Sequence, residues 1–223
     1  MEIRPDPTPT PEPRGSWRNT THDWAATVDP EHLARIRRAP ATFAPGGPGH
    51  LVLEVLAYAA DEAASRGGGR CLVTLHPDGS VAVADDGRGT DTRFDTDGRA
   101  VQKPIMATED LRFFDVPGAE RLPDGQPRRG MSTVAALSRW LLHTNRRANG
   151  AWRRRYAHGV PVTALEVVPA DGTTGTLVHF LPDEALGPRW SPTGDEPARW
   201  RAHWPDLTVR LDDRRTPGKR PGH

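Results

Sequence analysis

The sequence predicts an α/β protein, an α+β two-layer sandwich in which helices cover one face of a mostly antiparallel, mixed β-sheet. Two observations lead to this fold class. Segments 71–76 and 81–85 are apolar and strand-like, and the turn Pro-Asp-Gly-Ser between them is typical of a β-hairpin. The segment 50–65 is rich in Ala and Leu and contains no Gly or Pro, which predicts a helix.

The remaining elements follow from caps, breakers and alternation. Asp29 and Pro30 predict the start of a helix over 31–38, because Asp caps free N–H groups and Pro fits the first helical position. Segment 86–129 is rich in Gly, Pro, Asp and Arg and is expected to be a long loop, either a lid or binding loop or a disordered segment. Beyond it we expect a helix over about 130–142 and strands at 141–147, 151–157, 162–168, 175–181 and 207–211.

Composition limits the classes of function. The chain has 223 residues and a formal net charge of +1, so no overall field favours nucleic acid. The single cysteine, Cys71, excludes an internal disulfide. No apolar run is long enough to span a membrane and the N-terminus does not resemble a signal peptide, so we expect a cytoplasmic protein without membrane contact.

Composition also divides the chain into three parts. Residues 1–28 are Pro-rich and are expected to be disordered or extended. Residues 29–183 carry the predicted sandwich. Residues 184–223 form an extension that contains three Trp residues and ends in a basic tail.

Strand 81–85 ends in two carboxylates, Asp85 and Asp86, which are followed by Gly87 and Gly89. A carboxylate at a strand end, next to backbone without side chains, can accept a hydrogen bond from the exocyclic amine of a base such as adenine. Asp-Asp-Gly is also an ordinary turn sequence. The motif alone therefore leaves both a ligand site and a simple turn open.

The Asp85 motif is one of five segments that together point to a protein family. In chain order they are 49–63, the Asp85 motif, 130–138, His158–Pro161 and 174–180. In order and spacing they resemble the ATP-binding domain of the B subunit of DNA gyrase and its type IIA topoisomerase relatives, which are GHKL ATPases. The resemblance covers about Glu31 to Pro182. It implies the Bergerat-type ATP-binding fold and ATP or ADP as the ligand.

The resemblance assigns roles to individual residues. It implies that Glu54 is the general base for ATP hydrolysis, that Asp85 reads adenine and that Thr176 hydrogen-bonds to Asp85. It also implies that Gly87 and Gly89 form the floor of the pocket and that Arg88 lies near the base. The alternative for Glu54 is a solvent-facing helix glutamate.

Two departures from the family pattern concern the phosphate side. Tyr58 stands where the family has an Mg²⁺-holding Asn, and a phenol is a poor Mg²⁺ ligand, so we assign no metal site and leave Mg²⁺ an open question. The family has a glycine-rich lid over the phosphates, and residues 124–130 correspond to it here. Only Gly130 among them falls on a glycine of the family pattern. The helix start at Gly130 still offers N–H groups. Arg128 and Arg129 are candidates for phosphate contact, although plain surface arginines are an equally good interpretation.

The leading hypothesis is a stand-alone adenine-nucleotide-binding domain with weak or lost hydrolysis, so whether the chain is an enzyme stays open. One alternative is a non-enzymatic interaction module for a protein or DNA partner, and another is a truncated topoisomerase ATPase subunit that acts with partner chains. The chain ends at His223, before the transducer and DNA-cleavage domains of a gyrase subunit. We therefore expect at most weak, nonspecific DNA binding.

Overall fold

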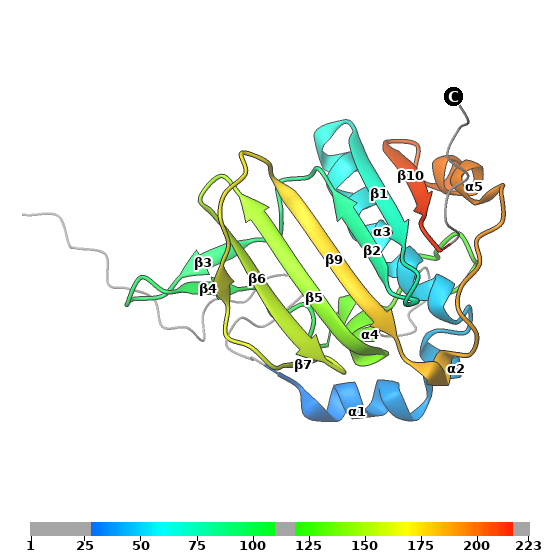
Figure 1. The fold of residues 1–223 in the computed structure, drawn as a ribbon, viewed down its shortest axis with the longest axis horizontal. Coiled ribbons are helices and arrows are strands. Elements are labelled where there is room, and N and C mark those ends of the chain that lie inside the picture. Colours follow the sequence, from blue (N-terminus) through cyan, green and yellow to red (C-terminus); the bar gives the residue numbers. More distant parts are fainter. Residues whose placement is uncertain (1–27, 110–118, 216–223) are drawn as a thin grey trace, which may run out of the picture.

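A computed structural model of the chain describes residues 28–109 and 119–215. Its main sheet has eight strands in the order β10-β1-β2-β9-β5-β6-β7, with β8 also paired to β6 (Figure 1). The strands are β1 (Gly69–Leu75), β2 (Val81–Asp85), β5 (Ser138–Arg147), β6 (Gly150–Ala157), β7 (Val160–Pro161), β8 (Glu166–Val167), β9 (Gly175–Pro182) and β10 (Leu207–Asp213). A separate hairpin pairs β3 (Thr92–Phe94) with β4 (Ala100–Gln102).

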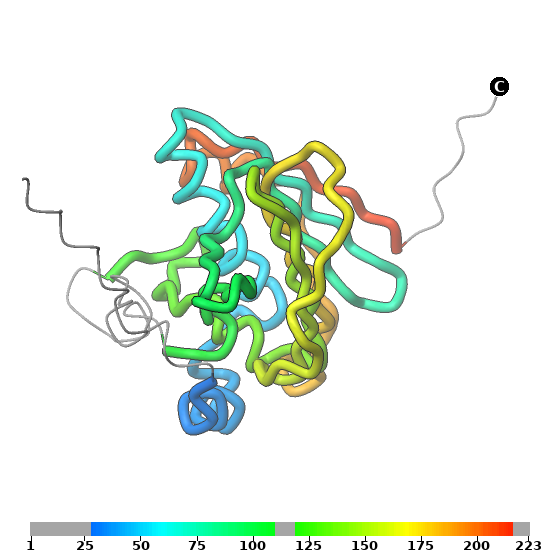
Figure 2. Tube along the Cα trace, turned by 90° about the vertical axis from the view of Figure 1, so that its left-hand side faces the viewer, coloured from blue at the N-terminus to red at the C-terminus, as the bar shows by residue number. Residues whose placement is uncertain are grey.

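The helices are α1 (Pro30–Arg38), α2 (Pro40–Phe43), α3 (Pro48–Arg66), α4 (Met131–Ala136) and α5 (Glu196–His203). The strands lie in front of α3 and α4 in Figure 1, and the edge-on view in Figure 2 shows α3 on one side of the sheet. Buried side chains of α3 such as Leu51 and Leu56 pack in one core with Val73 of β1 and Phe180 of β9. The predicted α/β sandwich with a mixed sheet is therefore confirmed.

Local sequence signals predicted several helix and strand boundaries correctly. The Asp29 side chain accepts a hydrogen bond from the His32 N–H (3.0 Å) and caps α1, with Pro30 at the first helical position. Helix α3 ends at Gly67, which adopts φ +72°, a conformation that glycine accepts at low cost. The β1–β2 hairpin forms as expected, with Val73 opposite Val83.

Three predictions of secondary structure were wrong. The helix expected over 130–142 ends at Ala136, because residues from Ser138 onward pair with β9 instead. Of the strand expected over 162–168 only β8 at 166–167 forms, and β7 lies just before the predicted range. Between them the Thr163 hydroxyl accepts the Arg155 N–H and so interrupts the backbone ladder. The loop 86–129 contains the β3–β4 hairpin.

Residues after 183 continue the same sheet and core. Strand β10 pairs in parallel with β1, from Gly69 opposite Leu207 to Leu75 opposite Asp213. Trp200 and Trp204 are buried in the common core, and Trp190 lies beside Trp200 with ring centroids 6.1 Å apart. The Pro-rich start and the end of the basic tail lie outside the described residues. No helix in the described ranges is long and apolar enough to cross a membrane.

Candidate functional site

A cavity of about 420 Å³ lies between α3, the β2–β9–β5 part of the sheet and the loop before α4. Helix α3 contributes side chains spaced three or four residues apart, which share one helix face. Two other cavities are smaller, at about 150 and 140 Å³. The lining of the large cavity includes Val55, Tyr58, Asp61, Glu62, Asp85, Arg88, Gly89, Lys103, Ile105, Met106, Met131, His143, Thr176 and Val178.

Asp85 and Thr176 are brought together from adjacent strands, although they are 91 positions apart in the sequence. One Asp85 carboxylate oxygen accepts hydrogen bonds from the Thr176 hydroxyl and the Thr176 N–H, and the other accepts from the Gly87 N–H at 2.8 Å. Burial raises the pKa of Asp85 above its usual range, although these hydrogen bonds oppose the rise. The structure thus holds this carboxylate in a fixed orientation at the cavity wall.

Glycines allow the close backbone approach around Asp85. Gly89 adopts φ +80°, and a Cβ there would lie 2.5 Å from the Arg146 carbonyl oxygen. Gly175, which the sequence analysis did not single out, adopts φ +123°, and a Cβ there would lie 2.0 Å from the Asp85 carbonyl oxygen. Any side chain at Gly175 would therefore separate β9 from Asp85.

Arg88 lies at the cavity but points its side chain onto α3. Its Nε donates to Glu62 Oε1 (2.7 Å) and its Nη2 donates to Glu62 Oε2 (3.0 Å), a two-pronged ion pair. The hydrogen bond from Arg88 lowers the pKa of Glu62. Arg88 is mostly exposed, so this pair shapes the cavity entrance and adds little to stability.

Glu54 is fully buried and does not face solvent. Its carboxylate oxygens accept hydrogen bonds from the backbone N–H groups of Arg129 (2.5 Å) and Gly130 (2.8 Å), just before α4. The Gly130 N–H, which we expected to be available for phosphate, is therefore already bound. Glu54 and Gly130 are thus hydrogen-bond partners of each other.

His50 is a buried partner of Glu54 that the sequence analysis missed. Its Nδ1 lies 2.7 Å from a carboxylate oxygen of Asp124, and its Nε2 lies 3.4 Å from Glu54 Oε1. Burial disfavours the charged imidazole, but the contacts with Asp124 and Glu54 outweigh burial and raise the pKa of His50 to about 9. The i, i+4 spacing of His50 and Glu54 on a helix was the available signal.

Arg128 and Arg129 are buried, so the interpretation as surface arginines was wrong. The Arg128 guanidinium forms a bidentate ion pair with Asp61 (3.1 and 2.8 Å), donates to Glu120 (2.8 Å) and lies over the Tyr58 ring at 4.8 Å. Burial disfavours its charge, yet the bond to Asp61 raises the pKa of Arg128 further. The Arg129 guanidinium lies 5.9 Å from the Phe43 ring centre.

The residues at the expected metal position do not fit Mg²⁺. Tyr58 packs its ring against a cation, and Asp61, the nearest carboxylate on the same helix face, is paired with that cation. Among residues 28–109 and 119–215, no three His, Cys, Asp or Glu side chains cluster as a metal site. We therefore derive no step through a metal ion.

The sheet with helices on one face and the Asp85–Thr176 pair next to the cavity define a domain with the GHKL-type ATPase fold. No family model matches the chain. It is 32% identical to the B subunit of DNA topoisomerase 4 from Bacillus subtilis over 161 residues, which are 70% of this chain and 25% of that protein. It is 36% identical to the B subunit of DNA gyrase from Thermotoga maritima over 141 residues, 61% of this chain and 22% of that protein.

A third relative, the B subunit of DNA gyrase from Micrococcus luteus, is 33% identical over 193 residues, 83% of this chain and 27% of that protein. The chain thus spans about a quarter of the length of these relatives. The chain has a gyrase B-like domain, which confirms the resemblance found in its motifs.

Proposed function

We propose that this gyrase B-like domain binds ATP or ADP with the adenine base against Asp85, and that its hydrolysis of ATP is weak or lost. The observation that carries the proposal is the Asp85 carboxylate, which Thr176 and Gly87 hold in place beside a cavity of about 420 Å³. A volume in this range suits a small organic ligand.

The wall of the cavity supports recognition of a flat heterocycle. A carboxylate oxygen accepts from an exocyclic amine, and apolar side chains of Val55, Ile105 and Val178 offer surfaces for the faces of a base. The buried setting strengthens the charge-assisted hydrogen bond. A base with a carbonyl in place of the amine would present an acceptor to this carboxylate.

The phosphate side supports the second half of the proposal. Both Glu54 carboxylate oxygens already accept a backbone N–H, so a catalytic water would have to share the carboxylate with these two donors. The Arg128 charge is already compensated by Asp61 and Glu120, so it adds little attraction for phosphates. Most of the affinity would then come from the base.

Calorimetric titration of the chain with ATP, ADP and GTP, each with and without Mg²⁺, tests the proposal. We expect ATP and ADP to bind with similar affinity, Mg²⁺ to change that affinity little, and GTP to bind at least about tenfold more weakly. The absence of binding at millimolar ATP and ADP would refute nucleotide binding by this domain.

A further inference from the structure

His143 is a buried polar residue in the wall of the same cavity, and no role above uses it. It lies on β5, in the middle of the sheet, with 1% of its surface exposed, and it lines the cavity together with Asp85 and Thr176. A buried histidine is costly unless its ring nitrogens have hydrogen-bond partners. Of the two ring nitrogens of His143, Nδ1 has a hydrogen-bond partner in the protein.

Gln102 of β4 is the hydrogen-bond partner of the His143 Nδ1. The Gln102 amide nitrogen lies 2.7 Å from His143 Nδ1, and an amide NH₂ group can only donate. With the amide in this orientation, Nδ1 is the acceptor and the neutral ring carries its hydrogen on Nε2. Burial lowers the pKa of His143 to about 4, so the ring is neutral at pH 7. Nε2–H is then the donor that a molecule in the cavity can meet.

The sheet register places this donor close to the Asp85 carboxylate. Thr176, which binds Asp85, is directly opposite Asn145, and Val178 is directly opposite His143. His143 is thus the diagonal neighbour of Thr176 on the same face of the sheet, where such residues lie about 7–8 Å apart. An acceptor at Asp85 and a donor at His143 therefore reach into one cavity from neighbouring positions.

An aminopurine carries the complementary pair of groups. In adenine the exocyclic amine is a donor, and the ring nitrogens on either side of it are acceptors. We infer that His143 is a second base-reading residue, whose Nε2–H donates to a ring nitrogen next to the amine that Asp85 accepts from. The inference rests on the proposed nucleotide function. It names the ligand as a 6-aminopurine, which carries both the amine for Asp85 and a neighbouring ring nitrogen for His143.

Binding of two ATP analogues tests this inference, with 7-deaza-ATP and 1-deaza-ATP each lacking one of the two ring acceptors. We expect one analogue to bind wild type about three- to tenfold more weakly than ATP, which is the range of one neutral hydrogen bond. His143→Leu removes the donor at similar size and should bind ATP and that analogue equally. His143→Gln keeps an N–H donor and should restore part of the preference for ATP.

Calorimetry gives the affinities, and thermal unfolding shows whether each variant is folded. If wild type binds ATP and both analogues equally, or if His143→Leu keeps the full preference, the role of His143 is overturned while the Asp85 proposal stands. If wild type does not bind ATP, both proposals fall. Should His143→Leu not fold, His143→Gln takes its place, and an ATP preference as large as that of wild type in this variant overturns the role of His143.

Discussion

The guanidinium of Arg128 lies over the Tyr58 ring, 4.8 Å from its centre. Tyr58 follows Glu54 by one helical turn on α3. Asp61 of the same helix holds the guanidinium from the side with two hydrogen bonds. Tyr58, which stands where the gyrase resemblance implies a metal ligand, therefore packs against a cation of the protein itself. An ion pair between Arg128 and Asp61 lies directly beside this position.

This arrangement should contribute to stability. Replacing Arg128 with Met keeps the buried stem but removes the cation, and we expect the free energy of unfolding to fall by about 1–3 kcal/mol. The loss stays in this range because Asp61 and Glu120 are roughly half exposed and remain hydrated. Urea unfolding measures the change. Arg139→Met breaks an exposed pair with Glu184 and serves as the control, with an expected loss below about 0.5 kcal/mol. Equal losses in the two variants would show that the buried Arg128 contributes no more to stability than an arginine in an exposed ion pair.

Hydrolysis of ATP should be very slow or undetectable, and Mg²⁺ should not stimulate it. The reason is that Glu54 is hydrogen-bonded to two backbone N–H groups and that Tyr58 and Asp61 are engaged with Arg128. Phosphate release from millimolar ATP over hours measures this. Strong Mg²⁺-dependent turnover that Glu54→Gln abolishes would identify a true ATPase and contradict this expectation.

The stability of the domain should decrease as the pH rises from about 6.5 to 9. His50 has a pKa raised to about 9 in the folded protein against an ordinary value of 6.5, so its stabilising proton is present below 6.5 and is lost as pH rises through 9. The full effect is at most about 3 kcal/mol. Urea unfolding across this pH range, compared with His50→Gln, measures the contribution. His203→Gln, at an exposed histidine of α5, is the control. A pH dependence that His50→Gln leaves unchanged would contradict the assignment.

The sequence predicted the pairing of Asp85 with Thr176 better than it predicted the surroundings of Glu54 and Arg128. Asp85 and Thr176 lie at the ends of β2 and β9, where the strand pattern and the motif fix their positions. The contacts of Glu54 with Arg129 and of Arg128 with Asp61 join residues 75 and 67 positions apart. They depend on the path of a loop that has no periodic pattern, so no local signal could reveal them.

The misplaced end of the helix over 130–142 has a similar cause. Met131–Ala136 and the residues that follow are both rich in apolar side chains, interrupted by a few polar ones, and no Gly or Pro separates them. Strand β5 forms from Ser138 because it pairs with β9 along most of its length. Long-range pairing of this kind overrides propensity and is not visible in a single segment.

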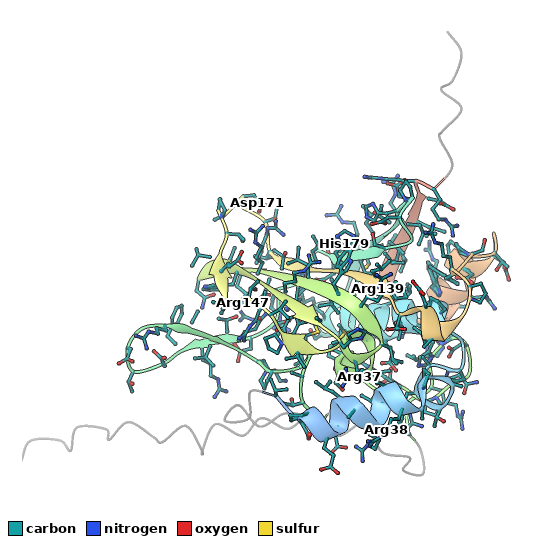
Figure 3. The ribbon with its side chains drawn as sticks, turned by 60° about the horizontal axis from the view of Figure 1, so that its bottom comes forward. Arg37, Arg38, Arg139, Arg147, Asp171 and His179 are labelled. Atoms are coloured by element: carbon teal, nitrogen blue, oxygen red, sulfur yellow. The ribbon has the colours of Figure 1, made fainter. Side chains whose placement is uncertain are left out.

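Any binding of DNA should be nonspecific and should weaken steeply with salt. Several arginines of the sheet are already paired, as Arg146 is with Asp171 (3.0 Å) and Arg153 with Glu166 (2.8 Å). Figure 3 shows labelled arginines spread over α1 and over both ends of β5. Scattered cations neutralise few phosphates in one register. Electrophoretic shift of a duplex across a salt series measures this, and tight binding at high salt would contradict it.

The most direct test of the central claim is the affinity of Asp85→Asn for ATP, measured by calorimetry next to wild type and Asp86→Asn. Asp86 carries the same charge one position later but binds Arg70, outside the large cavity. Asp85→Asn loses a charged hydrogen bond to the amine, so we predict a loss of about 1.5–3 kcal/mol, more than tenfold in affinity, with Asp86→Asn close to wild type. If Asp85→Asn is folded and binds ATP as tightly as wild type, Asp85 does not read the base and the account is contradicted.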